Sequence, residues 1–261
     1  MKAYNIIVLA KQVPDTRNVG KDAMKADGTV NRAVLPAIFN PEDLNALEQA
    51  LRIKDLFPGT TVKILTMGPV RAAEIIREGL FRGSDGGILL TDRAFAGSDT
   101  LATSYALGQA LKKMGDIDLI IAGRQAIDGD TAQVGPQVAE KMNLLQVTYV
   151  EEVKELSGDT IILKRRLDRG VETVKCKLPL VITVNGTAPE CRVRNAKLLM
   201  KYKRAKTITE LQKENEDYTQ SYSNRPELNI PEWTVNDIET DASQLGLTGS
   251  QIGRASCRER V

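Results

Sequence analysis

The stretch DLIIAGRQAIDGDTAQVGPQVAEKM, residues 118–142, decides the fold class of this chain. Its first residues, 118–122, are mostly apolar, which is typical of a short strand buried on both faces of a parallel sheet. A loop rich in glycine and aspartate follows, and the apolar spacing predicts a helix from about residue 131 to residue 142. A strand that leads through a loop into a helix is the repeating unit of an α/β fold.

The same unit occurs earlier in the chain. Apolar runs of strand length occupy residues 4–10, 61–67 and 87–90. The helices predicted between them begin at Asn40–Pro41, at Pro69 and at Ser98–Asp99, because Asn, Ser, Asp and Pro favour helix starts. Such alternation implies right-handed crossovers and predicts an α/β fold with a mostly parallel, doubly wound sheet.

The pattern changes after residue 145. Four β-rich runs follow one another without helices between them, at residues 146–153, 160–167, 172–176 and 180–184. Turn residues such as Gly158–Asp159 separate them, as in β-hairpins. We therefore expect an antiparallel β extension of the sheet.

The remaining chain divides by composition. The α/β domain is expected to span residues 1–190, followed by a basic segment at 191–206, in which positions 192–206 carry seven Lys or Arg residues and no acidic residue. Residues 207–250 are polar with scattered apolar residues, a composition that cannot form a second core. They are expected to form a C-terminal arm that lies on this domain or on a partner.

Composition excludes several kinds of chemistry. The chain of 261 residues contains no histidine, which excludes Ser-His-Asp hydrolysis and most zinc sites. Its three cysteines form no CxxC pair, so we expect no metal site, no disulfide framework and a reducing, cytoplasmic location. A net charge of +2 gives no reason to expect nucleic acid, and no apolar run reaches the about 20 residues that span a membrane.

Ligands of open parallel sheets bind at the carboxyl ends of the strands. The loops there contain neither GxGxxG nor a Walker motif, which argues against an ordinary NAD dehydrogenase or ATPase. In the loop 123–136, free N–H groups at the following helix start could bind a phosphate, with Gly129, Thr131 and Arg124 beside it. The alternative is that Asp130 is a plain N-cap and Arg124 a surface charge.

Other loop residues also have two interpretations. Asp128 and Asp130 could be a metal pair but are more often caps, and Met67–Gly68–Pro69 could support an adenine or simply form a turn. Asp92 and Asp99 could form an acid–base pair, although caps and turn residues are favoured.

Taken together, the loops resemble those of a known family. The motifs are VLAKQVPDT (8–16), FNPEDLNALEQAL (39–51), TMGP (66–69), TDRAFAGSDTLATS (91–104) and GRQAIDGDTAQVGP (123–136). They resemble the beta (small) subunit of electron-transfer flavoproteins over roughly residues 1–206. The segments AQVGP (132–136) and AKQVPDT (10–16) are most similar to the corresponding segments of the bifurcating and nitrogen-fixation-associated branches of the family.

The resemblance implies a flavodoxin-like or adenine-nucleotide-hydrolase-like domain that pairs with an alpha subunit and carries electrons. It implies FAD in this subunit, reduced by NADH, in bifurcating members, or a structural AMP in shuttling members; we favour FAD. Acyl-CoA or related dehydrogenases are the implied redox partners, no catalytic side chain is required, and a stand-alone adenine-nucleotide sensor is a less favoured alternative.

The resemblance also implies site residues. The expected cofactor-binding positions are Ala10, Lys11, Asn40, Pro41, Asp43, Met67, Gly68, Asp92, Ser98, Asp99, Thr100, Thr103, Gly123, Arg124, Gln125, Ala126, Asp128, Gly129, Asp130, Thr131, Ala132, Gln133 and Val134. The basic segment corresponds to a partner-recognition loop, with Leu198 or Leu199 as the apolar anchor. The arm 207–250 would clasp the alpha subunit, and residues 251–261, which do not resemble the family's ending, are expected to be a non-native tail.

Overall fold

The computed structural model describes residues 2–15, 36–213 and 224–251. Its centre is a nine-stranded sheet in the order β11-β5-β4-β1-β6-β10-β7-β8-β9. The strands of this sheet are β1 (Asn5–Leu9), β4 (Thr61–Met67), β5 (Gly86–Leu90), β6 (Leu119–Gly123), β7 (Leu145–Ser157), β8 (Thr160–Leu167), β9 (Gly170–Lys177), β10 (Leu180–Val184) and β11 (Glu232–Trp233). A separate two-stranded antiparallel sheet pairs β2 (Gln12–Pro14) with β3 (Ala37–Phe39). The mixed α/β class predicted from the sequence is confirmed.

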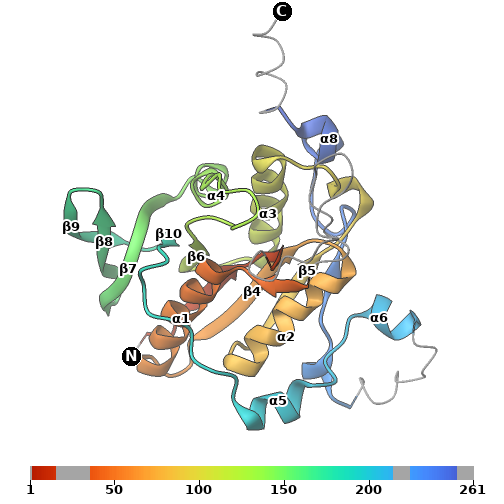
Figure 1. The fold of residues 1–261 in the computed structure, drawn as a ribbon, viewed down its shortest axis with the longest axis horizontal. Helices are drawn as coiled ribbons and strands as arrows, with labels where there is room; N and C mark the ends of the chain where they lie inside the picture. The colour runs from red at the N-terminus through yellow and green to blue at the C-terminus, as the bar shows by residue number, and fades with distance from the viewer. Residues whose placement is uncertain (1, 16–35, 214–223, 252–261) are drawn as a thin grey trace, which may run out of the picture.

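Helices cover both faces of the sheet (Figure 1). One face carries α1 (Pro41–Leu56) and α2 (Ala73–Arg82), and the other carries α3 (Thr100–Met114) and α4 (Val134–Met142). Side chains alternate along β1, so that Ile6 faces the α1 and α2 core while Ile7 faces the α3 and α4 core. Both are fully buried, which is why β1 reads as a continuous apolar run.

Short helices complete the described chain. They are α5 (Ala196–Tyr202), α6 (Ile208–Lys213), α8 (Gly246–Gly249) and the 3₁₀ turns η2 (Val70–Ala72), η3 (Arg93–Phe95), η4 (Pro226–Leu228) and η5 (Ala242–Gln244). Within the described ranges no helix has the length and apolar character required to cross a membrane.

The β extension differs from the prediction in one strand. β7, β8 and β9 are antiparallel neighbours, as expected, but β10 lies inside the sheet and pairs in parallel with both β6 and β7. All five residues of β10 are buried, so this strand gains most by taking a central place between two others. The prediction of an antiparallel extension at residues 180–184 was therefore wrong.

The fourth helix begins later than predicted. α4 starts at Val134 and not near residue 131, because Asp130 and Ala132 have φ values of 49° and 51°, which are incompatible with a right-handed helix. Thr131, Ala132 and Gln133 therefore belong to the loop.

The C-terminal arm packs on this chain's own domain. β11 pairs with the sheet edge at β5, and the side chains of Leu228, Ile230, Ile238 and Leu245 are buried in its two cores. That the arm also clasps an alpha subunit stays a prediction. The expected non-native tail lies outside the described residues from position 252 onward.

Candidate functional site

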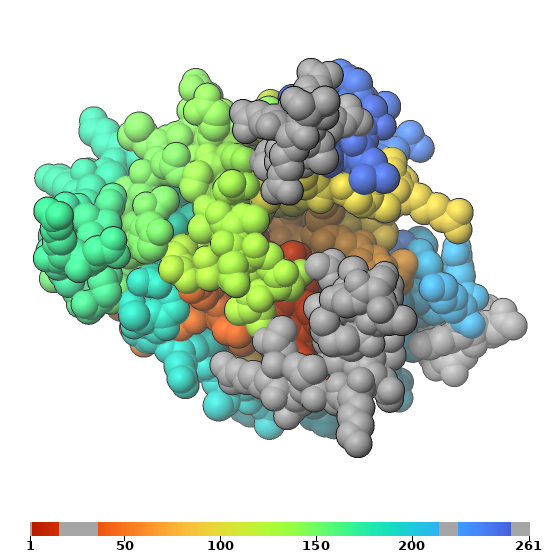
Figure 2. All heavy atoms as spheres, turned by 45° about the horizontal axis from the view of Figure 1, so that its top comes forward, coloured from red at the N-terminus to blue at the C-terminus, as the bar shows by residue number. Residues whose placement is uncertain are grey.

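A cavity of about 1120 Å³ lies at the carboxyl ends of β1, β4, β5 and β6. In Figure 2 the molecule is hollowed between the yellow-green loop after β6 and the yellow segment that leads into α3. Most of the predicted cofactor-binding residues line it: Ala10, Lys11, Asp43, Met67, Gly68, Asp92, Ser98, Asp99, Thr100, Thr103, Gly123, Arg124, Gln125, Ala126, Gly129, Asp130, Thr131, Ala132, Gln133 and Val134. Tertiary structure thus brings together loops that the sequence separates by more than a hundred residues.

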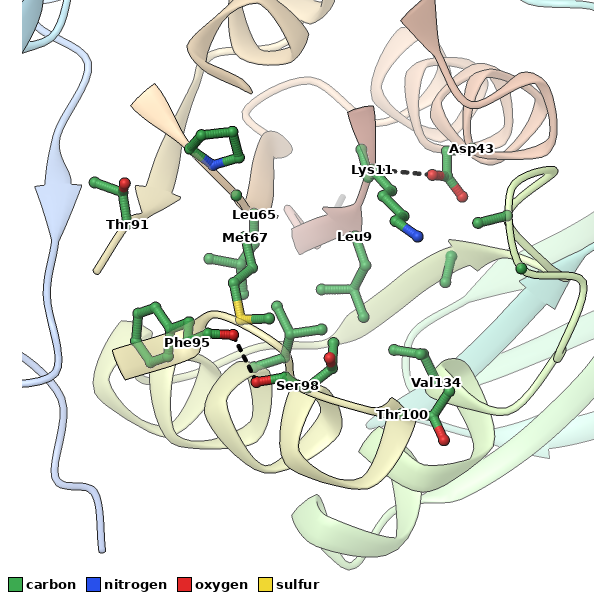
Figure 3. A pocket seen from close by; sticks show the side chains of 18 of the residues that line it. Leu9, Lys11, Asp43, Leu65, Met67, Thr91, Phe95, Ser98, Thr100 and Val134 are labelled. Carbon is green, nitrogen blue, oxygen red and sulfur yellow. Dashed lines mark hydrogen bonds between the residues drawn. The ribbon is translucent and has the colours of Figure 1, made fainter. Parts of the chain in front are cut away.

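The cavity has an apolar floor and a polar rim. Leu9, Leu65 and Met67 come from strand ends, and Figure 3 shows the side chains of Leu9 and Met67 projecting into its middle. Phe95 adds an aromatic wall and is mostly buried. An apolar interior with a few polar groups at its edge is the usual composition of a site for an organic cofactor.

The buried carboxylate of Asp43 joins two of the loops. It accepts the Lys11 backbone N–H at 2.8 Å and the Gly123 N–H at 3.0 Å (Figure 3 shows the first). Burial raises the pKa of Asp43 to about 7, while these hydrogen bonds oppose the rise. Asp43 therefore fixes the ends of β1 and β6 relative to the start of α1.

Two neighbours of Asp43 hold the loop after β6. The Asn40 side chain donates to the Gln125 carbonyl at 2.8 Å and accepts from the Ile127 N–H at 3.2 Å. Glu42 pairs with Arg124 at 3.0 Å and accepts the Gln125 N–H at 2.9 Å. Neither Asn40, which is fully buried, nor Pro41 lines the cavity, and Asn40 supports the loop from behind.

The start of α4 is suited to bind an anion. Its N-cap residue, Gln133, makes no side-chain cap hydrogen bond, and the first turn contains no acidic residue. By contrast, α1 has Glu42 and Asp43 in its first turn, and α3 is capped by Asp99. The free N–H groups and positive dipole end of α4 therefore remain available beside the cavity.

The two aspartates of this loop have separate roles. Asp128 pairs with the Lys11 ammonium at 2.7 Å and lines a smaller neighbouring hollow, not the main cavity. Asp130 accepts a hydrogen bond from the Gln125 side chain at 2.9 Å, and it does not cap α4. The alternative interpretation of Asp130 as the N-cap is wrong, and no group of three or more His, Cys, Asp and Glu side chains suited to a metal occurs among the described residues.

The loop after β5 is fixed by caps, as favoured from the sequence. Asp92 accepts the Ala94 N–H and Asp99 accepts the Ala102 N–H, both at 2.9 Å. The Ser98 hydroxyl donates to the Phe95 carbonyl at 2.8 Å. The Thr100 hydroxyl, which lies near Val134 in Figure 3, donates to the Gln133 side chain at 2.7 Å and so joins α3 to the other loop.

Comparison with known proteins identifies the family. The electron transfer flavoprotein domain matches residues 27–215. The chain belongs to the electron transfer flavoprotein family. It is 40% identical to the electron transfer flavoprotein subunit beta of Clostridium acetobutylicum over 98% of this chain and 88% of that protein.

Two further relatives share a shorter stretch with this flavoprotein chain. It is 50% identical to the caffeyl-CoA reductase-Etf complex subunit CarD of Acetobacterium woodii, over 68% of this chain and 67% of that protein. It is 44% identical to Protein FixA of Azorhizobium caulinodans, over 72% of this chain and 68% of that protein. The expected resemblance to beta subunits is confirmed, and these relatives support a function in electron transfer.

The cavity is also lined by residues that the sequence pattern did not predict. Thr209, Lys213, Glu232 and Thr234 from the arm line the cavity, and so does Arg71 in η2. The local residue pattern of the arm did not indicate that it lines the cavity, because this depends on where the arm packs in the folded chain.

The predicted recognition residues lie elsewhere. Leu198 and Leu199 are on α5, partly buried against the core on the α2 side. The strongly exposed apolar side chains of this region are Val193, at 85%, and Met200, at 62%. The role of Leu198 and Leu199 as anchors stays a prediction.

Proposed function

We propose that this chain is an electron-transfer flavoprotein beta subunit that binds FAD in the cavity and pairs with an alpha subunit. The observation that carries the proposal is the uncapped α4 start beside a large, apolar-floored cavity. The volume of about 1120 Å³ exceeds the range of about 300–1,000 Å³ usual for drug-sized ligands. It therefore suits a dinucleotide better than a mononucleotide.

The residues present fit such a ligand. A Cβ at Gly129 would meet no protein atom within 4 Å, so the loop leaves space for a ligand to approach its backbone. The N–H groups of α4, the Thr131 hydroxyl and the Arg124 guanidinium would hold the phosphates. Leu9, Leu65, Met67 and Phe95 would exclude water from the apolar part of the ligand.

FAD, when bound, supplies the hydride and one-electron chemistry. The side chains of this chain bind, orient and shield, and none of them is required to transfer a proton. Asp43, Asn40 and Glu42 keep the binding loops in place from behind the cavity.

The partners follow from the family and from the names of its members. We infer an alpha subunit, NADH as donor in a bifurcating type, and an acyl-CoA type dehydrogenase or reductase as redox partner. A relative named acryloyl-CoA reductase electron transfer subunit gamma, 50% identical over 68% of this chain, supports this class. The free thiols Cys176 and Cys191 support a reducing, cytoplasmic location.

Nucleotide content tests the proposal. The full-length chain would be co-expressed with an alpha subunit, and nucleotides released by acid would be separated by chromatography. Two FAD per heterodimer would support the proposal. One FAD and one AMP would make this a shuttling subunit with structural AMP, and no nucleotide in this chain would overturn the assignment of the cavity.

A matched pair of variants sharpens the test. Gly129→Leu places a side chain in open space, so it should lower nucleotide content without lowering the unfolding temperature of the nucleotide-free protein. Ala196→Leu, on the exposed start of α5, should change neither quantity. Full nucleotide content in Gly129→Leu would contradict binding at this loop.

A further inference from the structure

Tyr149 has a backbone conformation that is rare for an aromatic residue. Its φ is +60°, in the left-handed region, although it lies within strand β7. The pairing of β7 with β10 shifts register at the same place, between the partners of Ile182 and Val184. Such a conformation is energetically unfavourable for a residue other than glycine and persists only where the surroundings enforce it. Core burial does not explain it, because Tyr149 is 38% exposed.

The Tyr149 ring lies against the guanidinium of Arg124. The Arg124 Cζ atom is 5.8 Å from the centre of the ring, within the range of a cation–π contact. On its edge the same guanidinium pairs with Glu42, through Nη2 at 3.0 Å and Nε at 3.4 Å. Arg124 is therefore held at two places, by a carboxylate on its edge and by a ring.

The backbone joins the same elements. The Arg124 N–H donates to the Val184 carbonyl at 2.8 Å, and the Asn185 N–H donates to the Val150 carbonyl at 2.8 Å. The irregular part of β7 and the start of the cavity loop are thus connected through the end of β10. Arg124 lines the cavity, and its Nη1 group donates no hydrogen bond to the described residues.

We propose that Tyr149 is a positioning residue that orients Arg124 so that its Nη1 group faces an anionic group of the ligand, a nucleotide phosphate. The inference rests on the proposed function, because it assumes a phosphate in the cavity. The strained backbone at position 149 places the ring where a regular strand would not. Tyr149 itself touches Arg124 and acts through it.

Affinity and stability together test this role. The full-length chain, co-expressed with an alpha subunit and freed of nucleotide, would be titrated with AMP and with FAD by calorimetry. Tyr149→Phe keeps the ring and should bind within about twofold of the native chain. Tyr149→Gly removes both ring and strain, so it should bind about threefold to tenfold more weakly while its unfolding temperature stays equal or rises.

Two controls separate positioning from folding. Asn143, at the end of α4, also has left-handed backbone, with a φ of 53°. Asn143→Gly removes the backbone strain there and should leave the affinity for nucleotide unchanged. Tyr149→Asn, a residue type that tolerates left-handed backbone, provides a second ring-free variant with the same expected loss of affinity. In an Arg124→Gln background, removal of the ring should have no further effect on affinity.

The outcomes are distinguishable. Native affinity in both Tyr149→Gly and Tyr149→Asn, or an undiminished effect in the Arg124→Gln background, would overturn the inference and leave the proposed function standing. Loss of binding in Tyr149→Phe equal to that in Tyr149→Gly would also overturn it. Failure of the native chain to bind AMP or FAD would overturn the proposed function and the inference with it.

Discussion

Gly123 and Asp43 approach more closely than a side chain at position 123 would permit. A Cβ at Gly123 would lie 2.4 Å from Oδ1 of Asp43, the same oxygen that accepts the Gly123 N–H at 3.0 Å. The glycine at the end of β6 therefore allows a carboxylate from α1 to hold the loop that borders the cavity.

Gly123→Ala should destabilise the protein. The added methyl group would also lie 2.8 Å from the backbone nitrogen of Asp43, so the backbone must shift. We expect a loss of about 1–3 kcal/mol in the free energy of unfolding, measured by chemical denaturation. Gly129→Ala is the matched control, since its methyl group meets no atom within 4 Å. Equal stability of both variants would contradict the close contact with Asp43.

The stability contribution of Asp43 should fall as pH rises. Its pKa is about 7 in the folded chain and near 4 when unfolded, so the folded state binds the additional proton between these values. Ionisation then disfavours folding, and the loss accumulates from about pH 4 to pH 7. We expect the unfolding free energy of the native chain, relative to Asp43→Asn, to decrease by about 1–3 kcal/mol between pH 5 and pH 7. A pH-independent difference between the two proteins would show that Asp43 is ionised throughout.

The ion pair that attaches α6 to α2 should contribute more to the free energy of unfolding than an exposed ion pair does. Arg77 binds both oxygens of Glu210, at 2.9 and 3.0 Å, and both side chains are mostly buried. Glu210→Gln should lower the unfolding free energy by about 1–3 kcal/mol. Glu227→Gln is the control, because its pair with Arg225 is exposed and should contribute much less to stability. Similar losses in both variants would contradict the distinction.

The arm should behave as part of the folded domain. Ile238 is 3% exposed and lies in the α3 and α4 core, so Ile238→Ala should cost about 2–4 kcal/mol of unfolding free energy. Leu247, at 72% exposed, gives the control, and Leu247→Ala should cost less than about 0.5 kcal/mol. A cooperative transition unchanged by Ile238→Ala would mean that the arm unfolds separately from the domain.

Local patterns predicted most elements and the position of the cavity. The strand β1 and the helix cap at Asp99 each depend on residues that are close together in the sequence, so both can be predicted without knowledge of the fold. The rule that ligands bind at the carboxyl ends of parallel strands then located the site. The same reasoning placed β10 wrongly, because local pattern does not say which strand a run of apolar residues will pair with.

The sequence by itself determined that this chain is an α/β protein with loops of the electron transfer flavoprotein type, because strand and helix periodicities and loop residues are local properties. Only the tertiary structure decided that Asn40 supports the loop from behind, that Lys213 of the arm lines the cavity and that Tyr149 meets Arg124. These relationships join residues that lie far apart in the chain, and each depends on how the whole sheet buries its apolar faces.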